Sequence, residues 1–322
     1  MRLKLTFITA TLIVAAAFFV QGTLGSQTGG RANQTNQNNG DHAITLGTKL
    51  VNVTVTALDR YGRCVSGLDQ SMFDVYDNGV RQQIAHFTEE DMPVSVGIVY
   101  DVSGSMSPMM QRSAQVLRRF IEVSHPEDEF FLVTFASKPS LAQDFTTSPD
   151  AVANRLVLVK AGGSTALYDA VYIAIEKLKE GRHAKKALLI ISDGEENHSR
   201  YSLSELGELV KESGALVYAV GVGYREVGYP NAASFGHFGQ KVLNHLTALG
   251  GGKAFYPQLP EDDLDACLRI ALELRHQYSI GFYPSDVTSG RRWRELKVNL
   301  NAPHVLGRLA LIYRRDYPAF NN

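Results

Sequence analysis

Residues 94–106 read VSVGIVYDVSGSM, and this stretch indicates the fold class most directly. Its first seven residues are mostly apolar and β-branched, which is typical of a strand buried on both faces of a parallel sheet. Asp101 follows directly, where such a strand ends and where open α/β sheets bind their ligands. Ser103 and Ser105 come next, on the turn into a predicted helix over 109–123. The stretch therefore predicts an α/β sheet that carries oxygen ligands at one edge.

Downstream, strand patterns alternate with helix patterns. The predicted strands cover 129–135, 187–191, 216–220 and 253–256, and the predicted helices cover 165–178, 204–213, 240–249 and 260–276. Ser204 and Gly214 are expected at the two ends of the helix over 204–213. Alternation of this kind predicts an α/β fold with a doubly wound, mostly parallel sheet over residues 93–276.

The segments on either side have a different pattern. Residues 47–92 alternate apolar and polar side chains with a period of two, and residues 277–322 return to that pattern. Each segment carries about three strands, which is too few for independent stability. We therefore expect the two segments to form one small all-β, sandwich-like module, with the α/β domain inserted into it.

The amino terminus has the pattern of a targeting segment. Arg2 and Lys4 precede an apolar run of 16 residues, Leu5–Val20, which small and polar residues follow. This order predicts a secretory signal peptide over 1–25. The run is short for a membrane span, so membrane contact is expected only if the segment stays uncleaved as an anchor. Residues 26–46, rich in Asn, Gln and Gly, are predicted to be a flexible linker, and the protein to be secreted or periplasmic.

The composition narrows the classes of partner. The 322 residues suggest about two domains, and 32 Lys and Arg against 33 Asp and Glu give a net charge of −1. Because there is no strong basic excess, nucleic acid is not an expected partner. The two cysteines, Cys64 and Cys267, are too few for a disulfide scaffold. They can pair in an oxidising compartment or remain two separate thiols.

Two further loops carry oxygen-bearing side chains to the predicted sheet edge. Residues 162–165 read GGST at a helix start, and residues 192–194 read SDG directly after a buried strand. The candidate metal ligands are then two carboxylates and three hydroxyls, from Asp101, Ser103, Ser105, Thr165 and Asp193. Such hard ligands suit Mg²⁺, Mn²⁺ or Ca²⁺ and do not suit zinc or copper. Because hydroxyls are neutral, a partner's carboxylate gains strongly from binding at an open coordination position.

The three motifs DVSGSM, GGSTALYDA and ISDG resemble the metal-ion-dependent adhesion site of von Willebrand factor type A domains. The resemblance covers about residues 93–276. It implies that Ser103, Ser105 and Thr165 contact the ion through their hydroxyls, and that Asp101 and Asp193 act directly or through water. The flanking stretches SGLDQSMFDVYDNGVRQQIAHF, QYSIGFYPS and WRELKVNL resemble a group of secreted bacterial proteins, the VWFA-related domain proteins.

These observations predict an exported protein-binding module, not an enzyme, which engages an acidic residue of a partner protein through a divalent cation. No small-molecule substrate and no organic cofactor are expected. One alternative is a secreted hydrolase that uses Ser103 or Ser105 with His125 or His198, although the Gly-x-Ser-x-Gly elbow is missing. Another is a structural scaffold whose metal site is vestigial.

Overall fold

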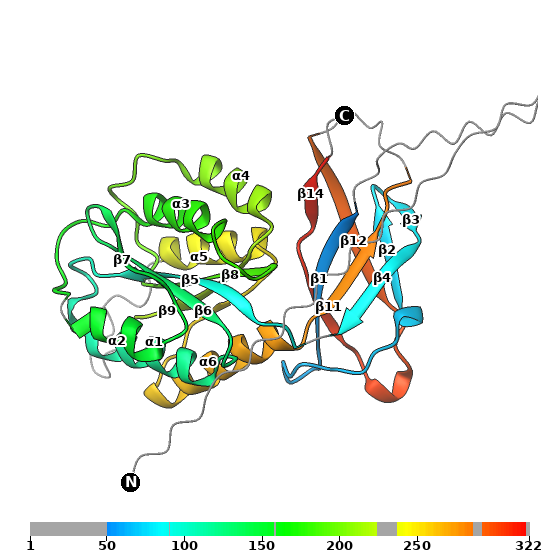
Figure 1. Ribbon diagram of the computed structural model, residues 1–322, viewed down its shortest axis with the longest axis horizontal. Helices are drawn as coiled ribbons and strands as arrows, with labels where there is room; N and C mark the ends of the chain where they lie inside the picture. The colour runs from blue at the N-terminus through cyan, green and yellow to red at the C-terminus, as the bar shows by residue number, and fades with distance from the viewer. Residues whose placement is uncertain (1–49, 90, 158, 224–236, 286–291, 320–322) are drawn as a thin grey trace, which may run out of the picture. The chain divides into compact units, whose positions relative to one another are not determined.

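A computed structural model describes residues 50–89, 91–157, 159–223, 237–285 and 292–319 (Figure 1). The predicted signal peptide and linker lie outside these residues. Within the described ranges, no helix combines the length and the hydropathy that crossing a membrane requires.

A six-stranded sheet forms the centre of the α/β domain. Its order is β10-β9-β8-β5-β6-β7, and every neighbouring pair is parallel except β6 and β7. All eight residues of β5 are buried, as its apolar sequence predicts. In sheet order the strands are β10 (Ala254–Phe255), β9 (Leu216–Gly221), β8 (Lys185–Ser192), β5 (Val94–Asp101), β6 (Glu129–Phe135) and β7 (Pro139–Thr146).

Helices cover both faces of this sheet (Figure 1). One hydrophobic core lies under α1 (Met110–Val123), α2 (Pro149–Val157) and α6 (Pro260–Arg275). The other lies under α3 (Leu167–Leu178), α4 (Leu203–Ser213) and α5 (His237–Leu249). The prediction of a doubly wound, mostly parallel α/β fold is confirmed. The edge strand β7 and the short helix α2 are additions to the predicted elements.

Local capping sets the bounds of α4. Ser202, and not Ser204, is its N-cap: the Ser202 hydroxyl accepts a hydrogen bond from the Glu205 amide at 3.3 Å, and a Glu205 carboxylate oxygen accepts from the Ser202 amide at 2.8 Å. This reciprocal capping satisfies two amides that the first helical turn leaves free. Gly214 ends the helix with φ = 64°, a left-handed conformation that favours glycine.

The β segments before and after the α/β domain pair with each other. One four-stranded sheet has the order β13-β1-β11-β4 and the other β14-β12-β2-β3. Val53 lies opposite Ile280 across the first sheet, and Val75 lies opposite Val298 across the second. All four side chains belong to one core, so the two sheets pack against each other. Each segment contributes strands to both sheets. The strands are β1 (Val51–Leu58), β2 (Phe73–Asp77), β3 (Val80–Gln82), β4 (Ile84–Glu89), β11 (Tyr278–Phe282), β12 (Trp293–Leu300), β13 (Ala310–Ile312) and β14 (Asp316–Pro318).

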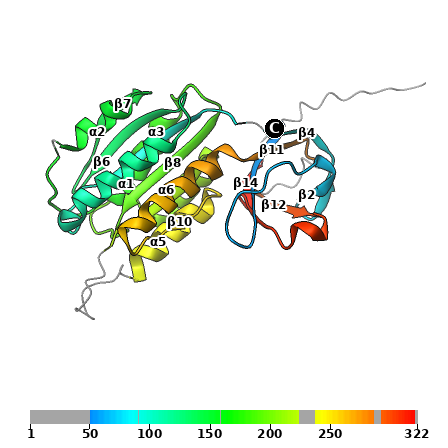
Figure 2. The same cartoon turned by 90° about the horizontal axis from the view of Figure 1, so that it is seen from below.

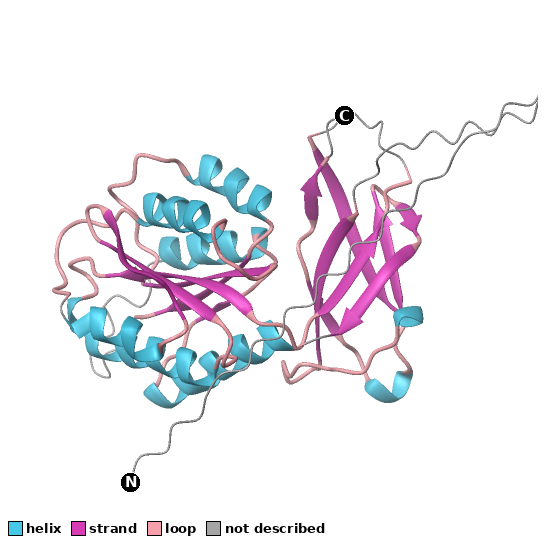
Figure 3. Ribbon diagram, viewed as in Figure 1, coloured by secondary structure: helices cyan, strands magenta, loops and turns pink. Residues whose placement is uncertain are grey.

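Figure 3 shows the contrast in secondary structure: among the described residues, the long helices belong to the α/β domain, whereas the β module carries short helical turns. The two cysteines are free thiols, with Cys267 buried on α6 and Cys64 partly buried.

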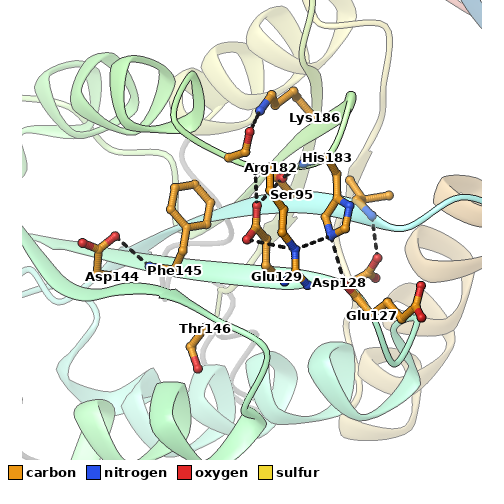
Figure 4. A network of polar contacts seen from close by, with 12 residues as sticks. Ser95, Glu127, Asp128, Glu129, Asp144, Phe145, Thr146, Arg182, His183 and Lys186 are labelled. Atoms are coloured by element: carbon orange, nitrogen blue, oxygen red, sulfur yellow. Dashed lines mark hydrogen bonds and ion pairs between the residues drawn. The ribbon is translucent and has the colours of Figure 1, made fainter. Parts of the chain in front are cut away.

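A closed polar network ties together the amino-terminal ends of three strands (Figure 4). The Ser95 hydroxyl donates to the Glu129 carboxylate at 2.6 Å, and both side chains are buried. The backbone amides of Arg182 and His183, in the loop before β8, donate to Glu129 at 2.6 Å and to the Ser95 hydroxyl at 3.0 Å. The network therefore fixes that loop to the start of β5 and β6.

Candidate metal centre

Asp101 lies at the carboxyl end of β5 and is completely buried. One of its carboxylate oxygens accepts a hydrogen bond from the Ser103 amide at 2.8 Å. The other accepts from the hydroxyl of Ser192 at 2.6 Å. Ser192 ends β8, which neighbours β5 at the point where the strand order reverses. The carboxyl group is thus held from two strands at the position where such sheets bind ligands.

Two hydroxyls stand beside this carboxyl group. The Oγ atoms of Ser103 and Ser105 are 3.1 Å apart. Ser103 is buried, whereas Ser105 is exposed. The turn after β5 therefore presents a pair of hydroxyls, one of which solvent or a partner can reach.

The second loop is fastened to the first by backbone hydrogen bonds. The Gly104 amide donates to the Gly163 carbonyl at 3.0 Å, and the Gly162 amide donates to the Val102 carbonyl at 2.8 Å. Gly163 has φ = 88°, and a β-carbon there would lie 2.7 Å from the Ser137 hydroxyl, so glycine is required. Thr165 follows on this loop and is buried just before α3.

The third loop is fastened to the second by hydrogen bonds of Asn197 and Glu196, which the sequence does not predict. Asn197 accepts a hydrogen bond from the Thr165 amide through Oδ1 at 2.9 Å, and its own amide donates to the Thr165 carbonyl at 3.0 Å. Glu196 accepts from the Tyr168 amide in the first turn of α3 at 3.0 Å. Asp193, half-buried, begins this loop and accepts from the Glu195 amide at 3.0 Å.

The five candidate ligands thus lie on three loops at one edge of the sheet. Hydrogen bonds join Asp101, Ser103 and Ser105 directly. Thr165 and Asp193 come to this edge on loops that are bonded to one another and to the turn after β5. Ser192, Glu196 and Asn197 hold the arrangement together.

Burial raises the pKa of Asp101 to about 6, and the nearby negative charge of Asp193 contributes to the rise. The hydrogen bonds from Ser103 and Ser192 act in the opposite direction. The ionised carboxyl is therefore destabilised by its surroundings, and a bound dication would offset that cost. Among the described residues, no group of three or more His, Cys, Asp or Glu side chains is arranged so that it could hold a metal ion. An ion at this edge would take two carboxylates and otherwise hydroxyls and water, a donor set that fits a hard divalent cation.

The histidines considered for the hydrolase alternative are not bonded to the serines. His125 precedes β6, at the opposite edge of the sheet, where its amide donates to Asp128 at 2.9 Å. His198 is exposed, and its backbone amide donates to the Thr165 carbonyl. In the described part of the chain, no histidine forms a hydrogen bond with Ser103 or Ser105.

Residues 96–196 match the family model of the von Willebrand factor type A domain. Two curated relatives are each 25% identical: inter-alpha-trypsin inhibitor heavy chain 4 of Mus musculus over 166 residues, and an uncharacterized protein of Borreliella burgdorferi over 139 residues. The matches cover 46% and 40% of this chain, and 18% and 40% of those relatives.

Among solved structures, BatB of Bacteroides thetaiotaomicron is 18% identical with a TM-score of 0.46, and the match covers 56% of this chain and 98% of that one. The match to the family model identifies the α/β domain as a member of the von Willebrand factor type A family.

Proposed function

We propose that the protein is an exported protein-binding module that holds a divalent cation at this edge and engages a carboxylate of a partner protein through it. The ligands would be Asp101, Ser103, Ser105, Thr165 and Asp193. The observation that carries the proposal is the Asp101 carboxyl, which is completely buried at the ligand-binding edge, close to a second carboxylate. A buried carboxyl in such a place is costly unless a positive charge joins it.

The charge balance supports an acidic partner. Two carboxylates neutralise a dication, and the hydroxyls complete its shell without adding charge. A partner's Asp or Glu that replaces a water molecule at the remaining position then makes a charged contact in a partly desolvated site. Membership of the von Willebrand factor type A family supports protein binding as the general class of function.

Metal binding is tested by calorimetry and by thermal shift of the full chain with Mg²⁺, Mn²⁺ and Ca²⁺. We expect a response in the native protein that is lost in Asp101→Ala and in the milder Asp101→Asn. Ser105→Ala and Ser107→Ala form a matched pair, because both serines are exposed and only Ser105 belongs to the ligand set. Ser105→Ala should weaken metal binding and Ser107→Ala should not. An unchanged metal response in Asp101→Ala rules out the assigned site.

Partner binding is tested by a pull-down from the native host with and without chelator. Thr165→Ala and chelator should each weaken capture, and added Mg²⁺ or Mn²⁺ should reverse only the effect of the chelator. Capture that persists under both treatments would place the interface elsewhere, on the β module. The hydrolase alternative instead requires turnover of an ester or peptide that Ser103→Ala or Ser105→Ala abolishes. The scaffold alternative requires a native chain without any metal response.

A further inference from the structure

The outer face of α6 carries a row of exposed leucines. Leu264, Leu268 and Leu272 expose 42%, 39% and 44% of their surface. They follow one another at intervals of four residues, so they share one face of the helix. The opposite face packs into the core through Cys267, Ile270 and Leu274. Figure 2 shows α6 on the outside of the α/β domain, beside α1.

The leucine row, which we call the α6 stripe (Leu264, Leu268 and Leu272), has oppositely charged ends. Glu261 lies three residues before Leu264, and Arg275 lies three residues after Leu272. These five residues are spaced symmetrically about Leu268, and the helix carries a negative charge at Glu261 and a positive charge at Arg275. An identical helix running antiparallel would therefore place Leu264 against Leu272, Leu268 against itself and Glu261 against Arg275.

The surroundings of the α6 stripe suit such a helix. A groove of about 620 Å³ runs between α1 and α6, and its lining includes Arg118, Arg119 and Leu264. Glu261 is exposed and forms no ion pair among the residues that the structure describes. Arg275 binds Asp91 through Nε at 2.9 Å and Nη2 at 2.5 Å. A second carboxylate at the other side of this planar, multi-donor guanidinium would extend the pair into a network.

We propose that a second copy of this chain covers the α6 stripe, with the two α6 helices antiparallel about a two-fold axis that passes near Leu268. Such an interface is self-complementary, since the same residues of both copies form it. The α6 stripe is short, so the dimer is expected to be weak and to dissociate on dilution.

The dimer would have a consequence for binding. α6 begins after β10, at the same sheet edge as the candidate metal centre. In an antiparallel pair the two candidate centres therefore face in opposite directions. A dimer of this form would bridge two partner molecules.

The first test is sedimentation equilibrium of the full chain over a wide concentration range. Leu268→Glu places two like charges at the axis and should weaken dimerisation at least tenfold. Ile173→Glu is the matched control, because Ile173 is an apolar residue of α3 with a similar exposed fraction of 37%. It should leave the dissociation constant unchanged. A native chain that is monomeric at every concentration overturns the proposal. An unchanged dissociation constant in Leu268→Glu overturns it as well.

Cysteine cross-linking tests the geometry in a Cys64→Ser, Cys267→Ala background. Leu268→Cys should form a disulfide with itself, whereas Leu264→Cys should cross-link only when mixed with Leu272→Cys. Eight residues of helix separate these two positions by about 12 Å, which is too far for a disulfide between two copies of the same variant. Self-cross-linking of Leu264→Cys would contradict the antiparallel arrangement.

Discussion

Glu273 of α6 is buried, and we predict that its burial makes the stability of the folded chain depend on pH. Only 1% of its surface is exposed, and burial raises its pKa from 4.5 to about 7, although Lys253, Tyr218 and Arg269 act to lower it. The Tyr218 hydroxyl and both side-chain polar atoms of Gln277 are buried too, and none of these groups, nor Oε2 of Glu273, has a hydrogen-bond partner of normal geometry among the described residues. The carboxyl is thus kept neutral mainly by desolvation.

The sign of the effect follows from proton binding. Between pH 4.5 and 7 the folded chain holds a proton on Glu273 that the unfolded chain has released, so stability falls as pH rises through this interval. With a pKa of about 7 in the folded chain and 4.5 in the unfolded chain, Glu273 lowers the free energy of unfolding by about 3 kcal/mol at pH 8. At pH 5 the loss is less than about 1 kcal/mol. Glu273→Gln removes the charge at nearly constant shape. It should therefore be about 3 kcal/mol more stable than the native chain at pH 8, and close to it at pH 5.

The assay is urea unfolding at both pH values in chelator, followed by the helical circular-dichroism signal, because the described α-helices all lie in the α/β domain. The only tryptophan, Trp293, lies in β12 of the β module, so its fluorescence would report the wrong part of the chain. Glu127→Gln is the control, since Glu127 is exposed and the substitution is the same. Equal stabilities of the native and Glu273→Gln chains at pH 8, or a difference that does not change with pH, would contradict a raised pKa for Glu273.

Three further predictions follow from contacts described above or in the β module. Asn197→Ala frees the Thr165 amide and should lower metal affinity about tenfold by calorimetry while the fold persists; an unchanged affinity would contradict its positioning role. A chain of residues 93–276 should fold and bind metal, whereas residues 47–92 alone should show no cooperative unfolding, and a cooperative transition in that fragment would disprove the shared module. Asp77→Asn leaves the buried Arg294, now bonded to Asp77 at 2.6 Å, without its counter-ion. This substitution should destabilise the β module by about 3–5 kcal/mol, as measured by unfolding followed through Trp293 fluorescence. The double replacement Asp77→Leu, Arg294→Met should recover much of the lost stability.

The sequence alone predicted the central sheet well, because its strands are long apolar runs with no competing interpretation. Val94–Asp101 and Lys185–Ser192 are examples. β7 was missed because its polar and apolar residues do not alternate regularly and none of them is fully buried. The N-cap of α4 was predicted two residues too late: Ser202 and Ser204 are both good N-caps, but only Ser202 has a Glu three residues on.

The candidate ligands were predictable because each belongs to a short contiguous motif. The residues that hold the loops together were not, since their roles depend on hydrogen bonds between segments far apart in the chain. Asn197, for example, bonds to Thr165 across 32 residues of sequence. Nor does periodicity distinguish the two apolar faces of α6, because Leu264 and Leu268 recur at helical spacing just as the buried Ile270 and Leu274 do. Only the packing of the helix shows which face is left outside.

The two edges of the sheet show why one of them is suited to binding. Both pair a buried serine with a buried carboxylate: Ser95 with Glu129 at the amino-terminal edge, and Ser192 with Asp101 at the carboxyl edge. At the first edge the loop amides of Arg182 and His183 complete the network, and Arg182 also lies 3.4 Å from Glu129 as an ion-pair partner (Figure 4). The charge of Glu129 is thus compensated within the chain. At the second edge the charge near Asp101 is another carboxylate, Asp193, and the exposed Ser105 hydroxyl lies 3.1 Å from the hydroxyl of Ser103. An arginine pairs with the buried carboxylate at one edge, whereas among the described residues no Lys or Arg forms an ion pair with Asp101 at the other. A bound metal ion would supply a positive charge there.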